Sequence, residues 1–372
     1  MKTTYFREIG GILLLALAGV SAFGQEPVIA SFGQNGQLVA TNLAPGSIAR
    51  VEWASSALGP WTNTWAGLDA VTADSNGAIQ VSVPMFYRVR GLAATTNPPG
   101  MVLIPAGAFT MGDTMDGLAN ATPINVTVSA FYMDTNLVSL TQWQGVYSYA
   151  LSHGYTFRYA GSGKGVNHPV HSVNWYDCVK WCNARSEQAG KPPVYYTDAT
   201  QTTVYRTGEL AITNECVNWA ASGYRLPTEA EWEKAARGGL FGKRFPWGDT
   251  ISQSQANYQG VIGGYDLGPN GYSAAFTNGL TPYTSPVGSF APNGYGLYDM
   301  AGNVVEWCWD VYATPYAGGS DPRGAASGSY RVYRGGNWFN GASSCRSAWR
   351  NYSSPNNAPN SYGFRSVLPS NQ

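Results

Sequence analysis

From Leu240 to the C-terminus the sequence is dominated by Gly, Asn, Pro and Tyr, and it predicts short strands at best. Of the 372 residues in the chain, 45 are glycine and 13% are aromatic, whereas only 12% are charged. An average soluble domain has about 25% charged residues. Glycine permits backbone with positive φ, and large buried rings hold irregular loops in place. The sequence therefore predicts a loop-rich globular protein and excludes a disordered one.

The charge pattern limits the classes of partner that we expect this protein to bind. Formal net charge is zero, from 22 basic and 22 acidic residues, and the sequence contains no basic run or stripe. Binding to nucleic acid or to an acidic membrane surface normally needs such a patch. We therefore expect neither partner, and no sequence feature indicates a particular oligomeric state. A chain of 372 residues is longer than one compact core usually needs, so we expect two domains.

The N-terminus, Met1–Gly24, has the pattern of a secretory signal peptide. Lys2 and Arg7 supply the positive end, and Gly10–Val20 is the apolar stretch. Small residues follow it, so we expect cleavage near Gly24 and a secreted or periplasmic protein. The apolar stretch is shorter than the roughly 20 residues of a stable membrane span. A retained anchor is the alternative.

The segment 26–91 predicts a small, separate all-β module. Ile48–Trp53 (IARVEW) alternates apolar and charged side chains, which is typical of a strand with one buried face. We expect a β-sandwich-like fold, acting as a spacer or an adhesive element. The segment 92–100 is rich in small residues and proline, as linkers are. The second domain is expected over 101–370.

Three helices are expected in the second domain. Ser139 begins a capping box, in which the first polar side chain and one three residues later bond to each other's backbone, and its helix reaches about Ser152. The segment 174–183 places two tryptophans and two cysteines on one stripe. Thr228 begins a second capping box, and the helix after it ends at Gly238.

Several charged residues of this domain are expected to support the fold. Glu229 and Glu233 share a helix face in the first turns, where the helix dipole favours acids, so we expect a structural role and no catalysis. Arg346, Arg350 and Arg365 are expected to brace backbone carbonyls. A bound anion is the less favoured role for these arginines.

The number of cysteines is odd, which leaves at least one thiol free or paired between molecules. The five positions are Cys178, Cys182, Cys216, Cys308 and Cys345. Cys178 and Cys182 share a helix face and are poorly placed to bond to each other, so Cys216 is the natural partner of one of them. Cys308 and Cys345 form a second pair or stay as lone buried thiols.

Four segments of the second domain form a recognisable set. They are Gly223–Gly239 (GYRLPTEAEWEKAARGG), Phe245–Asp249 (FPWGD), Asn293–Trp307 (NGYGLYDMAGNVVEW) and Arg331–Arg365, which begins RVYRGGNWFN and ends YGFR. The set resembles the formylglycine-generating enzyme / sulfatase-modifying factor family, over roughly the last three quarters of the chain. The resemblance implies an α+β fold, a loop-rich variant of the C-type lectin fold. It also implies the family's reaction, in which copper held by two cysteines oxidises a sulfatase cysteine to formylglycine.

A calcium site is expected in the turn that begins at Asp299. Two acids, Asp299 and Glu306, lie seven residues apart across a Gly-Asn turn, and calcium prefers carboxylate and carbonyl oxygens gathered by such a turn. The resemblance implies four ligands: the side chains of Asp299 and Glu306, and the carbonyls of Gly302 and Val304. A salt-bridged or helix-capping pair is the alternative.

The resemblance implies a second calcium site that begins at Asn257. Its side chain and the carbonyl of Tyr258 match the family's first two ligands. The next ligand is Asp266 or lies in Asn278–Leu280, because the loop lengths differ from those of the family.

The copper centre of the family is altered in this chain. The family places its two cysteines five residues apart after Gly-Gly-Ser, and counting from Gly336 puts Asn340 and Cys345 at these positions (345 − 340 = 5). Counting back from the last motif, Gly363–Arg365, places Cys345 near the second position instead. Asn337 replaces the serine, and Val305 replaces a tryptophan before the glutamate of the calcium turn. An amide oxygen is a poor ligand for reduced copper, so we expect calcium and no copper.

The same region carries a possible ligand pocket. Asn337, Trp338 and Asn340 combine amides with a flat ring, which suits sugars or extended peptides. The alternative is that the tryptophan is core and the asparagines form turns. We expect an exported, catalytically divergent domain that binds a protein, peptide or glycan. The alternatives are a formylglycine-generating oxidase that uses Cys345 and an unforeseen second ligand, and a structural envelope or adhesion protein.

Overall fold

The computed structural model of the protein describes residues 6–8, 11–13, 27–32, 37–53, 70–82, 87–91, 97–117 and 119–370. The chain divides into two compact units, Met1–Thr96 and Asn97–Gln372. Most of the predicted signal peptide lies outside the described residues, as does the linker up to residue 96. Within the described residues, no helix is long and apolar enough to cross a membrane.

In the described part of the first unit, the regular elements are all strands. A hairpin pairs β1 (Phe6–Glu8) with β2 (Gly11–Leu13), and two three-stranded antiparallel sheets follow, ordered β3-β4-β7 and β6-β5-β8. These strands are β3 (Val28–Phe32), β4 (Gln37–Thr41), β5 (Ile48–Trp53), β6 (Val71–Thr72), β7 (Ile79–Ser82) and β8 (Tyr87–Gly91). Leu38 and Ile79 from one sheet share a core cluster with Ala49 from the other. A shared core between two sheets is the architecture of a small sandwich.

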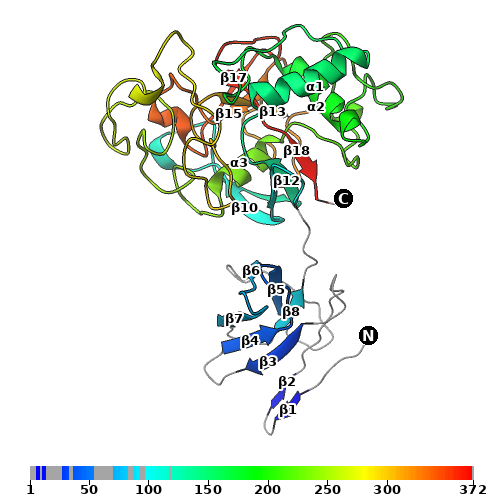
Figure 1. The fold of residues 1–372 in the computed structure, drawn as a ribbon, viewed down its shortest axis with the longest axis vertical. Coiled ribbons are helices and arrows are strands. Elements are labelled where there is room, and N and C mark those ends of the chain that lie inside the picture. The colour runs from blue at the N-terminus through cyan, green and yellow to red at the C-terminus, as the bar shows by residue number, and fades with distance from the viewer. Residues whose placement is uncertain are drawn as a thin grey trace. The chain divides into compact units, whose positions relative to one another are not determined.

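The second unit holds three small sheets, ordered β10-β11-β14, β18-β12-β9 and β16-β15-β13-β17. Their strands are β9 (Met101–Ile104), β10 (Gly107–Met111), β11 (Ile124–Val128), β12 (Phe131–Asp134), β13 (Val305–Val311), β14 (Gly319–Ser320), β15 (Arg331–Arg334), β16 (Arg350–Ser353), β17 (Tyr362–Gly363) and β18 (Val367–Pro369). The opening strand β9 and the closing strand β18 both pair with β12, so the two ends of this unit lie in one sheet (Figure 1).

The three expected helices are present: α1 (Leu140–Ser152), α2 (Trp175–Gln188) and α3 (Glu229–Arg237). The Ser139 hydroxyl accepts from the amide of Gln142 at the start of α1. At α3 both hydrogen bonds of the capping box form, and Gly238 ends the helix in the left-handed conformation. Helix α2 continues five residues beyond the predicted Asn183. These helix starts are set by local side-chain to backbone hydrogen bonds.

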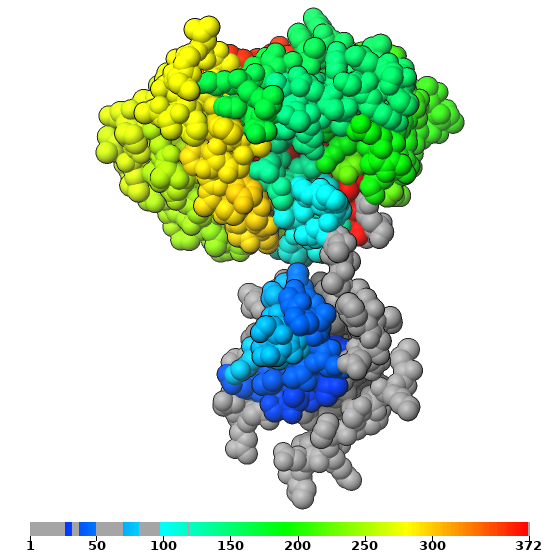
Figure 2. All heavy atoms as spheres, viewed as in Figure 1, coloured from blue at the N-terminus to red at the C-terminus, as the bar shows by residue number. Residues whose placement is uncertain are grey.

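Buried rings fill the core beside α1 and α2, which lie next to each other in Figure 1. The rings of Trp143 and Trp181 stack with centroids 5.8 Å apart. By contrast, residues 238–304 form no α-helix or strand and contain one 3-10 turn, Ala274–Phe276. This loop-rich segment gathers on one side of the unit, coloured yellow-green to yellow in Figure 2. The predicted α+β, loop-rich class is confirmed.

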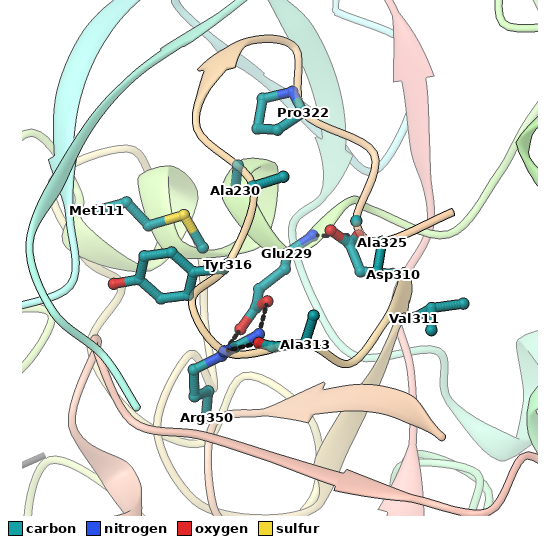
Figure 3. Close-up of a pocket in the computed structure, with 12 residues that line it drawn as sticks. Met111, Glu229, Ala230, Asp310, Val311, Ala313, Tyr316, Pro322, Ala325 and Arg350 are labelled. Carbon is teal, nitrogen blue, oxygen red and sulfur yellow. Dashed lines mark hydrogen bonds and ion pairs between the residues drawn. The ribbon is translucent and has the colours of Figure 1, made fainter. Parts of the chain in front are cut away.

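The acids of α3 bind arginines in the core. Both carboxylate oxygens of Glu229 accept from Arg350, at 2.6 and 2.5 Å, as Figure 3 shows. Glu233, which is fully buried, pairs with Arg237 and Arg334. Arg350 also donates to the carbonyl of Ala313, as expected from the sequence. The expectation was incomplete, because Arg346, Arg350 and Arg365 each also pair with a carboxylate.

Candidate functional site

The predicted calcium turn is a tight turn that leads into β13. Three of its residues have positive φ: Asp299 (55°), Gly302 (78°) and Asn303 (67°). At Gly302 only glycine fits, because a Cβ atom there would lie 2.3 Å from the carbonyl oxygen of Asn257. That oxygen accepts from the amide of Asn303 at 2.8 Å. The turn of the first predicted calcium site is therefore in direct contact with Asn257, a residue of the second predicted calcium site.

Asp299 is a buried carboxylate with few partners. One oxygen accepts from the amide of Gly288 at 2.7 Å, and the other lies 3.4 Å from the side-chain nitrogen of Asn303. Burial first, together with the charge of Glu306, raises the pKa of Asp299 to about 6. A bound cation would stabilise the ionised form of this carboxylate.

Glu306 is buried in β13 and already has a cationic partner. Its two oxygens accept from Arg365, at 2.7 and 3.0 Å. The salt-bridged alternative is therefore present, although the partner is Arg365 and comes from the end of the domain. This pairing holds the carboxylate in a fixed position near the turn.

The turn offers oxygen ligands of the kind that calcium prefers. Its side-chain donors are Asp299 and Glu306, and the carbonyls of Gly302 and Val304 complete the expected set. Among the described residues, no three His, Cys, Asp or Glu side chains come together as a metal site. A cation here would consequently depend on backbone carbonyls as well as on the two carboxylates.

Two candidate ligands of the second predicted site, Asp266 and the carbonyl of Tyr258, already accept hydrogen bonds. Asp266 accepts from the hydroxyl of Tyr258 (2.5 Å) and from the amides of Val261 (2.7 Å) and Gly268 (2.9 Å), so its carboxylate already serves the local turn. The carbonyl of Tyr258 accepts from the side chain of Gln253 at 3.2 Å. This leaves Asn278–Leu280, an exposed loop, as the better candidate for the third ligand.

Cys345 is fully buried in a small apolar cluster that contains Phe245 and Ile251 and no other cysteine. Its sulfur packs against the backbone at Gly336, where a Cβ atom would lie 3.0 Å away. Burial raises the pKa of Cys345 far above its usual range, so the thiol is protonated at neutral pH. A protonated thiol is a poor nucleophile, and a metal has to displace its proton before it binds the sulfur.

All five cysteines are free and buried. The predicted disulfide of Cys216 with Cys178 or Cys182 is therefore absent, although the three sulfurs lie in one core cluster. Cys308 lies in a different cluster from Cys345, so the second possible pair is absent as well. Each of these thiols packs as a small apolar side chain.

The asparagines of the predicted pocket, Asn337 and Asn340, form hydrogen bonds that stabilise the conformation of their loop. The side-chain oxygen of Asn337 accepts from the amides of Phe339 (3.1 Å) and Asn340 (3.0 Å). The carbonyl of Asn340 accepts from the amide of Gln259 at 2.9 Å. Asn337 is thus a turn residue, as the alternative expectation had it, while Asn340 is half-buried beside it.

Trp338 belongs to a group of rings that the sequence did not reveal. It is only 6% exposed, and its indole nitrogen is buried without a hydrogen-bond partner. Its ring centroid lies 5.7 Å from that of Tyr272, 5.4 Å from Tyr283 and 5.0 Å from Phe339. Tyr272 and Phe339 are each 40% exposed. We call these four residues the aromatic group; two of them come from the distant loop that contains Tyr272 and Tyr283.

Comparison with known proteins identifies the family to which the fold and the site described above belong. Residues 88–369 match the family described as "Sulfatase-modifying factor enzyme 1-like domain". The chain belongs to this family. It is 33% identical to the formylglycine-generating enzyme of Thermomonospora curvata over 72% of this chain and 92% of that protein. It is also 31% identical to the chaperone protein LppX of Paenibacillus barcinonensis, over 67% of this chain and 84% of that protein.

Solved structures of the sulfatase-modifying factor type have the same fold. The Treponema denticola variable protein 1 is 29% identical and superposes with a TM-score of 0.58, over 72% of this chain and 94% of that one. CarF is 30% identical with a TM-score of 0.55, over 73% of this chain and 98% of that one. The predicted family and its C-type lectin-like fold are thereby confirmed.

Proposed function

We propose that this sulfatase-modifying factor domain is catalytically divergent and binds a protein, peptide or glycan. One observation carries the proposal: Cys345 is a solitary, buried thiol where the family's copper chemistry needs two. Asn340 stands at the other position, and an amide oxygen does not replace a thiolate on reduced copper. The residues present therefore do not fit a copper centre.

The aromatic group supports binding as the retained activity. Two of its rings, Tyr272 and Phe339, are partly exposed, and Phe339 directly precedes Asn340. The cation of Lys164 lies 5.4 Å from the ring centroid of Tyr283, in the same group. Flat rings next to amide groups give apolar contact and hydrogen bonds together, which suits both sugar rings and extended backbone.

The purified mature protein is expected to bind no stoichiometric Cu(I) and to form no aldehyde on a Cys-x-Pro-x-Arg peptide. The reason is that only one sulfur is available and it is buried in an apolar cluster with no other cysteine. Cu(I) titration and peptide mass spectrometry measure both quantities, with the Thermomonospora curvata enzyme as the positive control. Cys345→Ser identifies adventitious copper, which would survive this substitution.

Aldehyde formation that is lost in Cys345→Ser would contradict the proposal. It would favour the alternative function, a formylglycine-generating oxidase, which the 33% identity to such enzymes supports. If no aldehyde forms, the binding half of the proposal is tested on glycan and peptide arrays. Phe339→Ala is the informative variant there, because this ring is exposed and its loss removes contact area only. An unchanged binding pattern would exclude the aromatic group as the binding surface.

We further propose that calcium stabilises the turn at Asp299. Removal of calcium with EGTA is expected to destabilise the domain by about 2–3 kcal/mol when the reference buffer holds roughly 100 times the Kd of calcium. Asp299→Ala is expected to abolish the response, whereas Asp249→Ala, an exposed acid outside the turn, is expected to keep it. Thermal unfolding with and without EGTA measures the effect. An equal response in wild type and Asp299→Ala would exclude this site.

The domain is also proposed to act outside the cytoplasm. The support is the sequence of Met1–Gly24, with its positive end and its apolar stretch Gly10–Val20. Sequencing the N-terminus of the protein recovered from its native compartment tests this point. An adhesive or spacer role for residues 26–91 remains the third candidate function.

A further inference from the structure

A pocket of about 220 Å³ lies between β13, the start of β15 and two loops. Its lining includes Ile212, Asn214, Trp309, Val311, Arg323 and Arg331. The lining holds two arginines and no acid, and it includes none of the residues of the aromatic group and not Cys345. We call it the arginine pocket. Figure 3 shows Val311 and Ala325 in the neighbouring pocket, which they also line.

Arg331 is a buried cation that forms no ion pair with a carboxylate in the part of the chain that the structure describes. Its side chain donates to the carbonyls of Trp309 (2.6 Å) and Ile212 (2.8 Å), and its guanidinium lies 3.8 Å from the ring centroid of Trp175. Only 7% of its surface is exposed. A guanidinium has five N–H groups, so these two bonds leave donor capacity on a side chain that lines the arginine pocket.

The other buried arginines among the described residues differ from Arg331, because they are paired with carboxylates. Each of the six is in an ion pair with a carboxylate: Arg225, Arg237, Arg334, Arg346, Arg350 and Arg365. Arg331 lies within ion-pair distance of no carboxylate among the described residues. Burying a charge normally requires a compensating partner.

The nearest acid on the same sheet does not supply that partner. Asp310 accepts from the amide of Glu229 at 2.7 Å, and burial raises the pKa of Asp310 to about 8. Its carboxyl is therefore largely neutral at pH 7. Glu215, on the loop that follows Asn214, bonds to the hydroxyl of Thr213 and does not line the pocket.

Arg323 supplies a second cation at the exposed side of the same pocket. Its guanidinium lies 4.3 Å from the ring centroid of Trp219, and it forms no ion pair with the described residues. Burial, followed by the nearby charge of Arg225, lowers the pKa of Arg323. A planar guanidinium held on an aromatic ring presents its N–H edge to a ligand, and this edge matches the oxygens of a carboxylate or sulfate.

We propose that the arginine pocket binds the oxyanion group of a small acidic ligand, with Arg331 at the floor and Arg323 at the rim. Ile212, Trp309 and Val311 supply apolar surface for the body of the ligand. Carboxylates, sulfate groups and phosphate groups share the required chemistry. The site is independent of the proposed binding activity of the aromatic group, since the two have no residue in common.

Isothermal titration with sulfate, phosphate and glucuronate, at constant ionic strength, tests the proposal on the full chain. At least one anion is expected to bind saturably, while glucose, which lacks the charge, is not. The anion that binds identifies the source: glucuronate for a carboxylate ligand, sulfate or phosphate for an ester. Arg323→Ala changes an exposed side chain and is expected to weaken binding about tenfold. Arg158→Ala, at another exposed arginine, is the matched control and is expected to leave the affinity unchanged.

Arg331→Lys separates charge from geometry. It keeps the cation and loses the planar fork, so weaker binding of the anion is expected. A lower melting temperature is expected as well, because the fork also donates to the carbonyls of Trp309 and Ile212. The proposal is overturned if none of the three anions binds saturably. It is also overturned if the affinity of the anion that binds is the same in wild type, Arg323→Ala and Arg331→Lys.

Discussion

Replacing Glu233 by alanine is expected to lower the free energy of unfolding of the second unit by about 3–5 kcal/mol, because it removes a buried carboxylate that two buried cations share. Glu233 is fully buried in α3 and pairs with both Arg237 and Arg334. It also accepts from the amide of Gly112 at 2.7 Å, which ties β10 to the helix. One substitution thus removes the carboxylate partner of Arg237, the closer of the two carboxylates of Arg334, and the acceptor of one buried amide.

Urea unfolding followed by tryptophan fluorescence measures this loss. Asp249→Ala is the matched control, because its partner Lys243 is 44% exposed and water replaces the lost interaction. The urea midpoint of the control is expected to stay nearly unchanged. Should Glu233→Ala fail to fold, Glu233→Gln keeps the hydrogen-bonding shape and removes only the charge. A midpoint close to wild type in both Glu233 variants would show that the two arginines find solvent or other partners.

The ion pairs of α3 also mark the limit of what local sequence patterns predict. The helix itself was predictable, because its capping box and terminal Gly238 act within a few residues. The partners of its acids were not, because Arg334 and Arg350 follow Glu233 and Glu229 by 101 and 121 residues. Charge at i and i+4 predicts a shared helix face and carries no information about which distant strand that face meets.

The candidate site also has some features that the sequence predicted and others that it did not. The turn from Asp299 to Glu306 was visible in the sequence because its tight geometry depends on the adjacent Gly302 and Asn303. The role of Asn337 as a turn residue was among the expectations for the same reason. Tyr272 and Tyr283 were missed, since they reach Trp338 from a loop with no periodicity. The abundance of tyrosine was the only available signal, and it gives no position.

Replacing Asp310 by asparagine is expected to stabilise the protein at pH 8 by roughly 2–4 kcal/mol and to have little effect near pH 4. Asp310 is buried beside Glu229 and accepts the amide proton of that residue at 2.7 Å (Figure 3). Burial first, and then the charge of Glu229, raises the pKa of Asp310 to about 8 from an ordinary value of 3.8. Asparagine keeps an oxygen that accepts this amide proton and cannot ionise.

The direction of the pH dependence follows from proton binding. Below about pH 4 the carboxyl is protonated in both the folded and the unfolded protein, so it contributes nothing to the pH dependence. Between pH 4 and 8 the folded protein retains a proton that the unfolded chain has lost, so stability falls as the pH rises. Above pH 8 both states are ionised, and the full cost of the buried charge remains. Asparagine removes this cost. Titrating groups that behave alike in wild type and in Asp310→Asn cancel in the difference between their free energies of unfolding.

Urea unfolding of wild type and Asp310→Asn at several pH values from 4 to 9 measures the difference directly. The stability difference is expected to grow steadily up to about pH 8 and then to level off. Asp249→Asn is the control, because Lys243 lowers the pKa of this exposed carboxyl below its ordinary value of 3.8. Its small contribution is lost only below about pH 4, so the stability difference of this control is expected to stay flat from pH 4 to 9. A constant difference across the range would mean that Asp310 is ionised throughout. Its charge would then compensate Arg331 and argue against an anion in the arginine pocket.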